Sequence, residues 1–363
     1  MKSLAVSLLC AGIFTMSAVP SAAVPSDPAR AIAGAAADQL ARLYVFPARA
    51  LAASQRLHER SDAGAYDGLA GKDLADRLTG DLADVLHDKH VRVHYSADAL
   101  PPAAPPGGAP SSEDLAEMTR FDEQAGFGLA RIAHLPGNVG YLEVEFFPHE
   151  SSERDRVIDG MADTIAYSNA VVLDLRRNGG GDPSAVARLL SHFLPEKTHL
   201  NDFVGRGDGD PKIENSTFTE RVPGPQITAP LYVLTSHRTF SGGEECAYDV
   251  QALKRGTLVG ESTGGGANPG APHRLDDHFD IFIPDARARN PITGTNWEGT
   301  GVVPDIAVSQ ERALATAYGM ALEAEAAKGP AASGGRFGPD DSLSPSAIRA
   351  ALPTMDDAKI LSL

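Results

Sequence analysis

Cysteine is scarce in this chain of 363 residues, which contains only Cys10 and Cys246. Cys10 lies in an N-terminal stretch that we expect to be removed, so Cys246 would be left without an internal disulfide partner. A folded unit of this size needs no disulfide, even in an oxidising compartment. Cys246 falls inside a segment with helical character, and we expect it in the core.

Positive charge is also in short supply. The chain has 32 Lys and Arg residues against 48 Asp and Glu residues, which gives a formal net charge of −16. No cluster of Lys or Arg offsets this charge, and a surface of this kind repels polyanions. Binding to nucleic acid and docking on an anionic membrane are therefore disfavoured.

Several motifs of well-known enzyme classes are absent. The sequence contains no His-Glu-x-x-His, no Cys/His cluster and no Gly-x-Ser-x-Gly. A zinc enzyme and an α/β-hydrolase are thus left without support. No Gly-Lys-Ser/Thr follows the glycine runs, which excludes a phosphate loop. We expect neither a metal nor an organic cofactor.

The apolar run at the N-terminus is too short to cross a membrane. It covers residues 4–16, whereas a transmembrane helix needs about 20 apolar residues. Lys2 before this run and the small residues at 21–23 after it complete the pattern of a secretory signal. We expect residues 1–23 to be a signal peptide, and the mature chain to begin at Val24. The protein would then be exported to the periplasm or the extracellular space.

The remaining chain divides into segments of different composition. Residues 24–98 are an expected N-terminal helical domain, because apolar residues recur at helical spacing through residues 28–88. Residues 99–125 are rich in Pro and Gly and are an expected linker. Residues 126–328 are the expected main core, and residues 329–363 an expected low-complexity tail with little order.

Strand-like and helix-like segments alternate in the core. The expected strands are 140–147, 170–175, 231–236 and 257–260, and the expected helices are 152–168, 184–194, 242–254 and 309–327. This alternation predicts an α/β fold with parallel pairing between strands. Residues 273–306 are expected to leave the core as a hairpin and return to it.

A serine stands where one of these strands turns into a helix, in the segment TFSGGEE at 239–245. The C-terminal edge of an open α/β sheet is where ligands bind. At the positive end of the helix, the amide of Gly242 would be placed to stabilise an oxyanion. Ser241 and Glu244 also have the spacing of a helix capping box, which taken alone is the commoner meaning of this pattern.

A glycine run follows an earlier strand, in the segment DLRRNGGG at 174–181. Successive glycines allow backbone N–H groups to converge on a cavity, as they do in an anion-binding nest. Taken in isolation, the same run is more often a plain turn.

Together these two segments resemble the tail-specific (C-terminal processing) and tricorn-core serine peptidase family, which also includes the interphotoreceptor retinoid-binding protein modules. The resemblance extends to VGESTGGG at 259–266, to NWEGTGVVPD at 296–305 and, upstream, to DKHVRV at 88–93. It covers residues 30–310 in the family's order. It implies a crotonase-like (ClpP/crotonase) spiral core behind an N-terminal helical domain.

The resemblance also implies roles for individual residues. Ser241 matches the nucleophile. Gly242 matches one source of oxyanion-binding amides, and the pair Gly180 and Gly181 matches the other. An acyl-enzyme mechanism with Ser241 as nucleophile follows from these matches.

His90 and Glu298 match the catalytic histidine and the acidic residue of the tricorn-like branch. Within the family, the chain is closer to the tricorn-core and retinoid-binding-like branch than to the C-terminal processing branch. A histidine that is neutral near pH 7 suits the activation of a serine, and a carboxylate on its other nitrogen fixes the tautomer. The C-terminal processing branch instead keeps a lysine where Gly266 stands, and it carries a PDZ domain, for which residues 96–125 are too short. In the tricorn branch a serine precedes the histidine, whereas here Lys89 does.

Alternatives remain open for these side chains. Without the family match, His90 would be assigned as a histidine at a helix end, and Glu298 as a solvated carboxylate in a loop. His87, His94 and His237 are other candidates for the base.

The sequence therefore predicts a serine-type peptidase that cleaves peptides or unfolded protein tails. The expected partner is a peptide or unfolded protein, without nucleic acid and without a membrane once the signal is removed. The alternative is a binding module for apolar ligands without catalysis, as in the retinoid-binding relatives.

Overall fold

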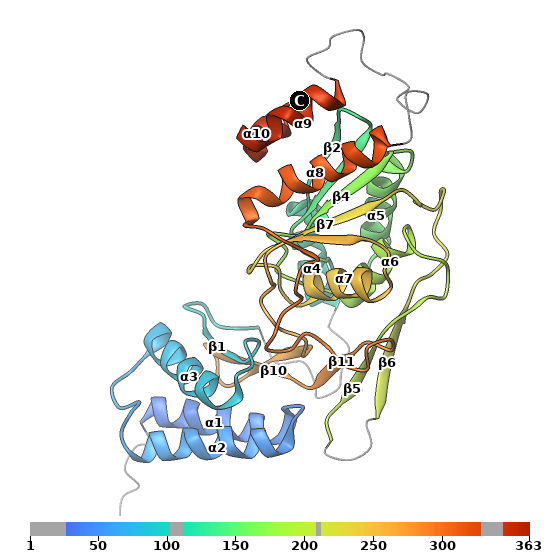
Figure 1. Ribbon diagram of the computed structural model, residues 1–363. Coiled ribbons are helices and arrows are strands. Elements are labelled where there is room, and N and C mark those ends of the chain that lie inside the picture. Colours follow the sequence, from blue (N-terminus) through green and yellow to red (C-terminus); the bar gives the residue numbers. More distant parts are fainter. Residues whose placement is uncertain (1–26, 102–111, 208–211, 328–343) are drawn as a thin grey trace, which may run out of the picture.

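The computed structural model describes residues 27–101, 112–207, 212–327 and 344–363. The expected signal peptide lies outside these ranges. Figure 1 shows three N-terminal helices at one end of the molecule and a larger part, built around a mixed sheet, at the other. No helix in the described part of the chain is long and apolar enough to cross a membrane.

The N-terminal helices are α1 (Pro28–Leu43), α2 (Pro47–Asp62) and α3 (Gly71–Leu86). Asp27 caps α1, because its side chain accepts a hydrogen bond from the Ala29 amide at 3.0 Å. Both α1 and α2 begin with proline, whose fixed φ suits the first helical position. The predicted helical character of residues 28–88 is confirmed.

A small sheet completes this N-terminal part with strands from two distant segments. It has the order β1-β10-β9, with β1 at Arg92–Tyr95, β9 at Gly270–Arg274 and β10 at Phe279–Pro284. Ile281 pairs with Val93, and both are buried in the same cluster as the leucines of α3. The helical part thus includes a hairpin that we had expected to belong to the core segment.

The central sheet has the strand order β12-β8-β7-β4-β3-β2. Its strands are β2 (Leu129–Leu135), β3 (Val139–Val144), β4 (Ala170–Asp174), β7 (Leu231–Thr235), β8 (Thr257–Gly260) and β12 (Ile306–Ala307). Neighbours from β3 to β12 are parallel, and only β2 runs antiparallel to its partner. The expected α/β fold with parallel pairing is confirmed, although β2 and β12 were not predicted.

Helices cover both faces of this sheet. Neighbouring residues of a strand point to opposite faces, and Leu173 and Val172 of β4 accordingly belong to different hydrophobic clusters. The first cluster contains side chains of α5 (Ser152–Ile165), α6 (Pro183–Ser191) and α7 (Gly242–Ala252). The second contains side chains of α8 (Gln310–Ala326). Cys246 is fully buried in the first cluster, as expected.

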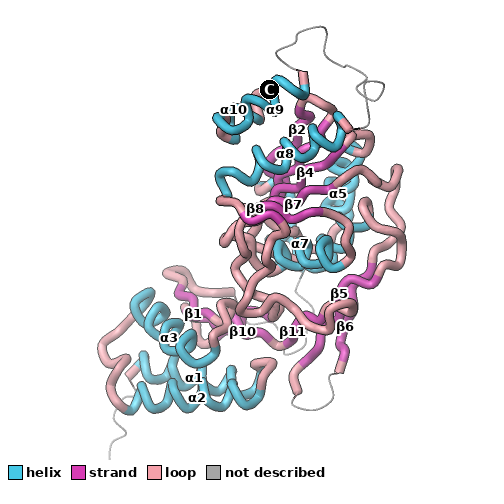
Figure 2. Tube along the Cα trace, in the orientation of Figure 1, coloured by secondary structure: helices cyan, strands magenta, loops and turns pink. Residues whose placement is uncertain are grey.

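A third sheet connects the two parts of the molecule. Its order is β11-β5-β6, with β5 at His199–Gly205, β6 at Ile213–Phe218 and β11 at Ala286–Arg289. Figure 2 shows these strands below α7, on the side of the N-terminal helices. Arg206, after β5, donates a hydrogen bond to the Tyr44 carbonyl at the end of α1. Helix α4 (Ser112–Gln124) lies within the expected linker.

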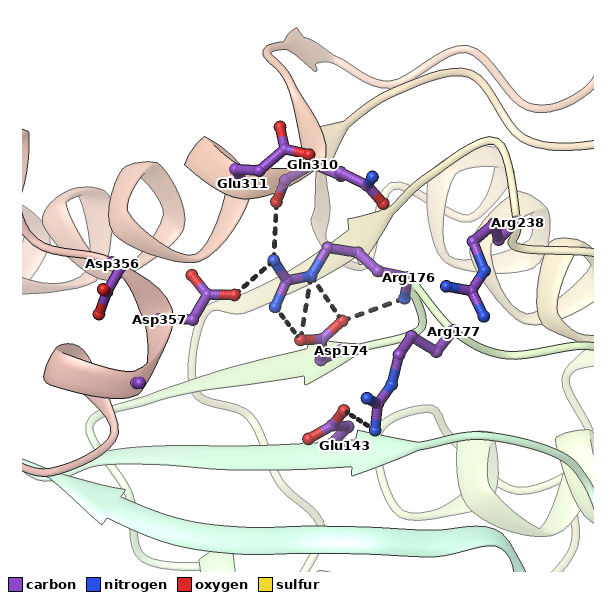
Figure 3. Close-up of a pocket in the computed structure, with 10 residues that line it drawn as sticks. Glu143, Asp174, Arg176, Arg177, Arg238, Gln310, Glu311, Asp356 and Asp357 are labelled. Carbon is purple, nitrogen blue, oxygen red and sulfur yellow. Dashed lines mark hydrogen bonds and ion pairs between the residues drawn. The ribbon is translucent and has the colours of Figure 1, made fainter.

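The C-terminal segment is ordered where we expected little order. Residues 344–363 contain α9 (Pro345–Ala351), a 3-10 turn and α10 (Asp357–Ile360). Ile348, Leu352 and Ile360 are buried in the cluster that α8 forms with the sheet. Figure 3 shows the polar edge of this contact, where Asp357 forms an ion pair with Arg176 at 2.7 Å. The expectation of a loose tail is therefore wrong for residues 344–363.

Deleting residues 344–363 is expected to lower the melting temperature by about 5 °C or more. The deletion exposes α8 and removes three buried apolar side chains, each worth about 1.5–3 kcal/mol as an upper estimate. Ile360→Ala should reproduce part of the loss, whereas Lys359→Ala, at an exposed position of the same helix, should not. Calorimetry on the shortened and the full chain makes the comparison, and equal melting temperatures would contradict the observed packing.

Candidate active site

Ser241 lies at the C-terminal edge of the central sheet, between β7 and α7, as the sequence predicts. Its backbone has φ 51° and ψ −119°. His87, which also has positive φ, keeps an ordinary left-handed ψ of 26°, so the Ser241 conformation is the less common one. Non-glycine residues in such sparsely populated conformations cluster at functional sites.

The glycine run lies directly beside Ser241. A Cβ atom on Gly180 would be 2.7 Å from the Ser241 Cβ, and one on Gly181 would be 2.0 Å from the Phe147 carbonyl oxygen. Both glycines also have positive φ, 109° and 129°. No other residue fits here without moving the backbone, so the close approach to Ser241 explains Gly180 and the close approach to Phe147 explains Gly181.

The amides around Ser241 differ in what they bind. The Gly180 amide donates to the Asn178 side-chain oxygen at 2.9 Å and is occupied. The amides of Gly181 and Gly242 have no acceptor among the described residues. The family resemblance implies the pair Gly180 and Gly181 as a source of oxyanion-binding amides. Because the Gly180 amide is occupied, the geometry favours the Gly181 amide as the donor that acts together with Gly242.

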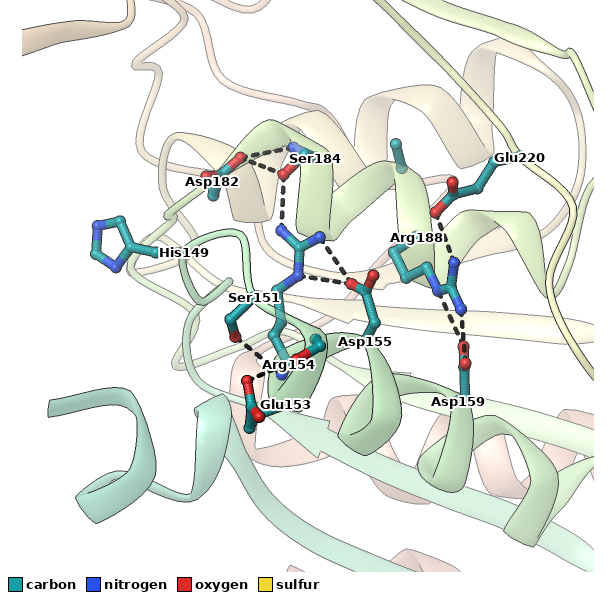
Figure 4. A network of polar contacts seen from close by, with 12 residues as sticks. His149, Ser151, Glu153, Arg154, Asp155, Asp159, Asp182, Ser184, Arg188 and Glu220 are labelled. Carbon is teal, nitrogen blue, oxygen red and sulfur yellow. Dashed lines mark hydrogen bonds and ion pairs between the residues drawn. The ribbon is translucent and has the colours of Figure 1, made fainter. Parts of the chain in front are cut away.

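Buried polar contacts hold the glycine loop. Asn178 is fully buried, donates to the Val144 carbonyl at 3.0 Å, and accepts the Phe240 amide on its own carbonyl at 2.9 Å. Beyond the glycines, Asp182 caps α6 by accepting the Ser184 amide at 2.8 Å. Figure 4 shows Arg154 of α5 donating to the Ser184 hydroxyl at 2.7 Å. The loop is therefore anchored to β3, to the Ser241 turn and to two helices.

Glu244 makes the helix-capping contact with Ser241 that the sequence suggests, and it also binds a neighbouring loop. Its carboxylate accepts the Ser241 amide at 2.9 Å and also binds the Thr263 hydroxyl and the amides of Gly265 and Gly266. Burial raises the pKa of this carboxyl, against the effect of those hydrogen bonds. Glu244 thus ties the start of α7 to the 263–266 loop beneath the site.

His90 reaches the same site from the N-terminal part of the chain. Its ring lies with its centroid 4.6 Å from that of Phe240, the residue before Ser241. The side chain is only 9% exposed. Neither ring nitrogen has a hydrogen-bond partner among the described residues, Ser241 included. Catalytic hydrogen bonds are often unformed without substrate, and the ring stands close to the Ser241 turn.

Two carboxylates flank the His90 ring. Asp88 is buried and accepts hydrogen bonds from Tyr44 at 3.0 Å, from Asn268 at 2.9 Å and from the His90 amide at 3.0 Å. Its Oδ1 lies 3.6 Å from His90 Nδ1. Burial opposes ionisation of Asp88, but the contacts with His90 and Asn268 outweigh it, so the pKa lies below its usual value.

Glu298 is the second carboxylate. Its Oε2 accepts the Ala267 amide at 2.6 Å, while its Oε1 is buried without a partner. Burial, together with the charge of Asp88, raises the pKa of Glu298 to about 7. One polar atom from each of Asp88, His90 and Glu298 lies within 4.8 Å of the others. The structure thus brings His90 and Glu298 together near Ser241, and it adds Asp88, which the sequence analysis did not single out.

Gly266 stands where the family resemblance implies a lysine in the C-terminal processing branch. A Cβ atom here would lie 2.3 Å from Phe240 Cζ and 2.7 Å from His90 Cε1. The rings of Phe240 and His90 therefore fill the space that a lysine side chain would enter. Lys89 points elsewhere, since its ammonium group donates to the Gly264 carbonyl at 2.6 Å.

The other candidate histidines lie outside this cluster. His94 contacts Asp280 at 3.2 Å, and His237 contacts Glu261 at 3.1 Å. Both side chains are more than half exposed. His87 is exposed at the end of α3. Of the histidines weighed from the sequence, only His90 packs against the residue that precedes Ser241.

Comparison with known proteins identifies a family for part of the chain. Residues 138–308 match the family described as Peptidase family S41. The chain carries a peptidase family S41 domain. This segment includes Ser241, the glycine run and Glu298, but not His90.

Individual relatives match over part of their length. The chain is 31% identical to the tricorn protease of Thermoplasma volcanium over 146 residues, which are 40% of this chain and 13% of that protein. It is 28% identical to carboxyl-terminal-processing peptidase 1, chloroplastic, of Arabidopsis thaliana over 179 residues, 49% of this chain and 35% of that protein. The chain thus covers about a third or less of these relatives.

The fold is also similar to that of solved structures. A lipoprotein from Streptococcus agalactiae superposes with a TM-score of 0.53 at 14% identity, covering 85% of this chain and 99% of that one. At this identity the likeness concerns the fold alone.

A buried acidic pair lies on α7, the helix that Ser241 begins. Asp249 is fully buried and Glu245 is 3% exposed, and Asn201 contacts both carboxyls. Burial raises the pKa of Asp249 to about 8, and burial with the charge of Asp249 raises the pKa of Glu245 as well. The folded protein therefore keeps protons on this pair that the unfolded chain releases in mild acid.

The melting temperature is expected to fall as the pH rises from about 4 to about 8, because of the raised pKa of Asp249. The stabilisation is fully present below the unfolded pKa and is lost progressively until the pH reaches the folded pKa, where the fall ends. Each pH unit within this range costs about 1.4 kcal/mol, or about 2–4 °C. Asp249→Asn should flatten this fall between pH 5 and pH 7, and the exposed Asp62→Asn should not. An identical slope in Asp249→Asn would contradict the assignment.

Proposed function

We propose that this chain is an exported serine peptidase that cleaves peptides or unfolded protein tails, with Ser241 as nucleophile, His90 as general base and Glu298 as the residue that orients His90. The observation that carries the proposal is the position of the His90 ring, packed on Phe240 in the space left by Gly266, with the free Oε1 of Glu298 beside it. A serine at a helix start, two unoccupied amides and a histidine–carboxylate pair make up the parts of an acyl-transfer site.

The reaction proceeds in two steps. Ser241 Oγ attacks the peptide carbonyl carbon while His90 takes the hydroxyl proton, and the amides of Gly242 and Gly181 bind the oxyanion. His90 then gives the proton to the leaving amine as the C–N bond breaks. Water, deprotonated by His90, releases the acyl group from Ser241. The carboxylate of Glu298 stabilises the imidazolium in both steps.

The arrangement favours the tricorn-like variant of the family over the Ser–Lys variant. No lysine side chain fits at Gly266, and Lys89 is engaged with the Gly264 carbonyl. The crotonase-like spiral core, the signal peptide at 1–23 and a periplasmic or extracellular location belong to the same proposal. Parallel strands with crossover helices and the short run of apolar residues at the N-terminus support these points.

The test is hydrolysis of an unfolded polypeptide by the purified chain, with products identified by mass spectrometry. Wild type and Ser262→Ala, an exposed serine of the neighbouring loop, should both cleave the polypeptide. Ser241→Ala should not. If wild type cleaves no unfolded polypeptide but binds a retinoid or fatty acid tightly and saturably, the chain is a binding module instead.

A further inference from the structure

Three potential metal ligands gather beside Ser241. Each of Asp88, His90 and Glu298 offers one oxygen or nitrogen atom, and these atoms all lie within 4.8 Å of one another. His90 Nδ1 and Asp88 Oδ1 are already 3.6 Å apart. Zn²⁺ binds such ligands at about 2.0–2.2 Å, which places tetrahedral ligands about 3.4 Å from each other. Side-chain movements of about 1 Å would therefore bring the set around one ion.

The cluster has unused binding capacity. His90 is nine-tenths buried, and both of its ring nitrogens lack a hydrogen-bond partner in the described part of the chain. Glu298 Oε1 is buried and equally unpartnered. Buried polar atoms without partners carry a desolvation cost. An ion between the side chains would give a partner to one ring nitrogen of His90 and to Glu298 Oε1.

The charge of the cluster also favours a cation. Within the described ranges, neither Asp88 nor Glu298 forms an ion pair with a lysine or an arginine. The nearby Lys89 directs its ammonium group at the Gly264 carbonyl instead. The buried Asp88 and the half-buried Glu298 thus face a histidine with no fixed positive charge between them.

We propose that Asp88, His90 and Glu298 form a Zn²⁺ site that inhibits the enzyme reversibly. Imidazole with carboxylate oxygens suits Zn²⁺, whereas Mg²⁺ and Ca²⁺ require about six or more oxygen ligands. The inhibitory role rests on the proposed function, because an ion that occupies the lone pair of His90 prevents it from accepting the Ser241 proton. The ion is a regulator of the peptidase and takes no part in its chemistry.

Binding is tested separately from catalysis. The full-length Ser241→Ala variant is titrated with Co²⁺, whose visible absorption reports coordination, and Zn²⁺ is then added as competitor. We expect one saturable site per chain that Zn²⁺ displaces. Introducing Glu298→Gln into this variant should weaken Co²⁺ binding by more than about 100-fold, since even an outer-shell change costs about 10–100-fold. Asp88→Asn should weaken it as well.

His94→Ala is the matched control, since His94 forms an exposed pair with Asp280 on β10 and should bind Co²⁺ unchanged. Circular dichroism confirms that each variant is folded. The metal site is overturned if Ser241→Ala has no saturable site for Co²⁺. It is also overturned if adding Glu298→Gln and adding Asp88→Asn both leave the Co²⁺ affinity of Ser241→Ala unchanged. Either result counts whether or not the chain is a peptidase. In the active enzyme, Zn²⁺ at ten times its Kd should lower activity about tenfold, with recovery after chelation. Full activity at saturating Zn²⁺ overturns the inhibitory role alone.

Discussion

Replacing His90 with alanine is expected to lower kcat for peptide hydrolysis by about 10³-fold or more. Without the imidazole, nothing within the described cluster accepts the proton of the Ser241 hydroxyl. The nearby carboxylates do not compensate, because Asp88 is already occupied by Tyr44 and Asn268. Steady-state kinetics on an unstructured peptide, with circular dichroism to confirm folding, measures the effect.

Lys89→Ala is the matched comparison, since it removes the basic side chain that directly precedes His90. The variant loses the one hydrogen bond that Lys89 donates to the Gly264 carbonyl, so we expect its kcat to lie within about tenfold of the wild-type value. The reverse pattern, with an active His90→Ala and an inactive Lys89→Ala, would assign the base to lysine.

Glu298→Gln is expected to lower kcat by about 10²- to 10⁴-fold while KM stays close to wild type. Glutamine keeps the size of the side chain and can still accept the Ala267 amide. It loses the charge that stabilises the imidazolium, and this loss acts in the transition state more than in substrate binding. The same kinetic assay, extended over substrate concentration, separates kcat from KM.

Asp88→Asn tests the competing assignment, because Asp88 also lies beside the His90 ring. We expect it to alter stability, through Tyr44 and Asn268, more than it alters kcat. If Glu298→Gln retains wild-type kcat while a folded Asp88→Asn loses it, Asp88 orients the histidine.

Much of the fold follows from local pattern. Leu74, Leu78 and Leu82 recur at helical spacing, and all three are buried in α3 as this spacing predicts. The β4 and β7 strands are continuous apolar runs, which is typical of parallel strands covered on both faces. Their positions already locate the edge at which Ser241 and the glycine run meet.

The strands that join the two parts were not predictable in this way. Strand β5 buries Asn201 and Asp202, whose partners Asp249 and Arg289 are distant in sequence. Buried polar residues of this kind obscure the apolar pattern that a strand normally shows. In the C-terminal segment, α9 has only 7 residues, and such a short helix depends on packing against α8 rather than on its own propensity.

In the candidate site, too, some residues could be predicted from the sequence and others could not. Ser241, His90 and Glu298 could be assigned because they stand in motifs that resemble one family. Asp88 stands in one of those motifs too, but its hydrogen bonds to Tyr44 and Asn268 span 44 and 180 residues of sequence. Only the fold shows that these residues hold the loop that carries His90.

The most direct test of the account is covalent labelling of the folded protein with a fluorophosphonate, with the modified residue mapped by mass spectrometry. Such reagents mimic the acylation step, so they react with a serine that has both a base and an oxyanion hole. The account predicts a single modification at Ser241, much slower in His90→Ala and absent in Ser241→Ala. If the folded wild type stays unlabelled while a known serine hydrolase reacts, or if another serine carries the label, Ser241 is not the nucleophile.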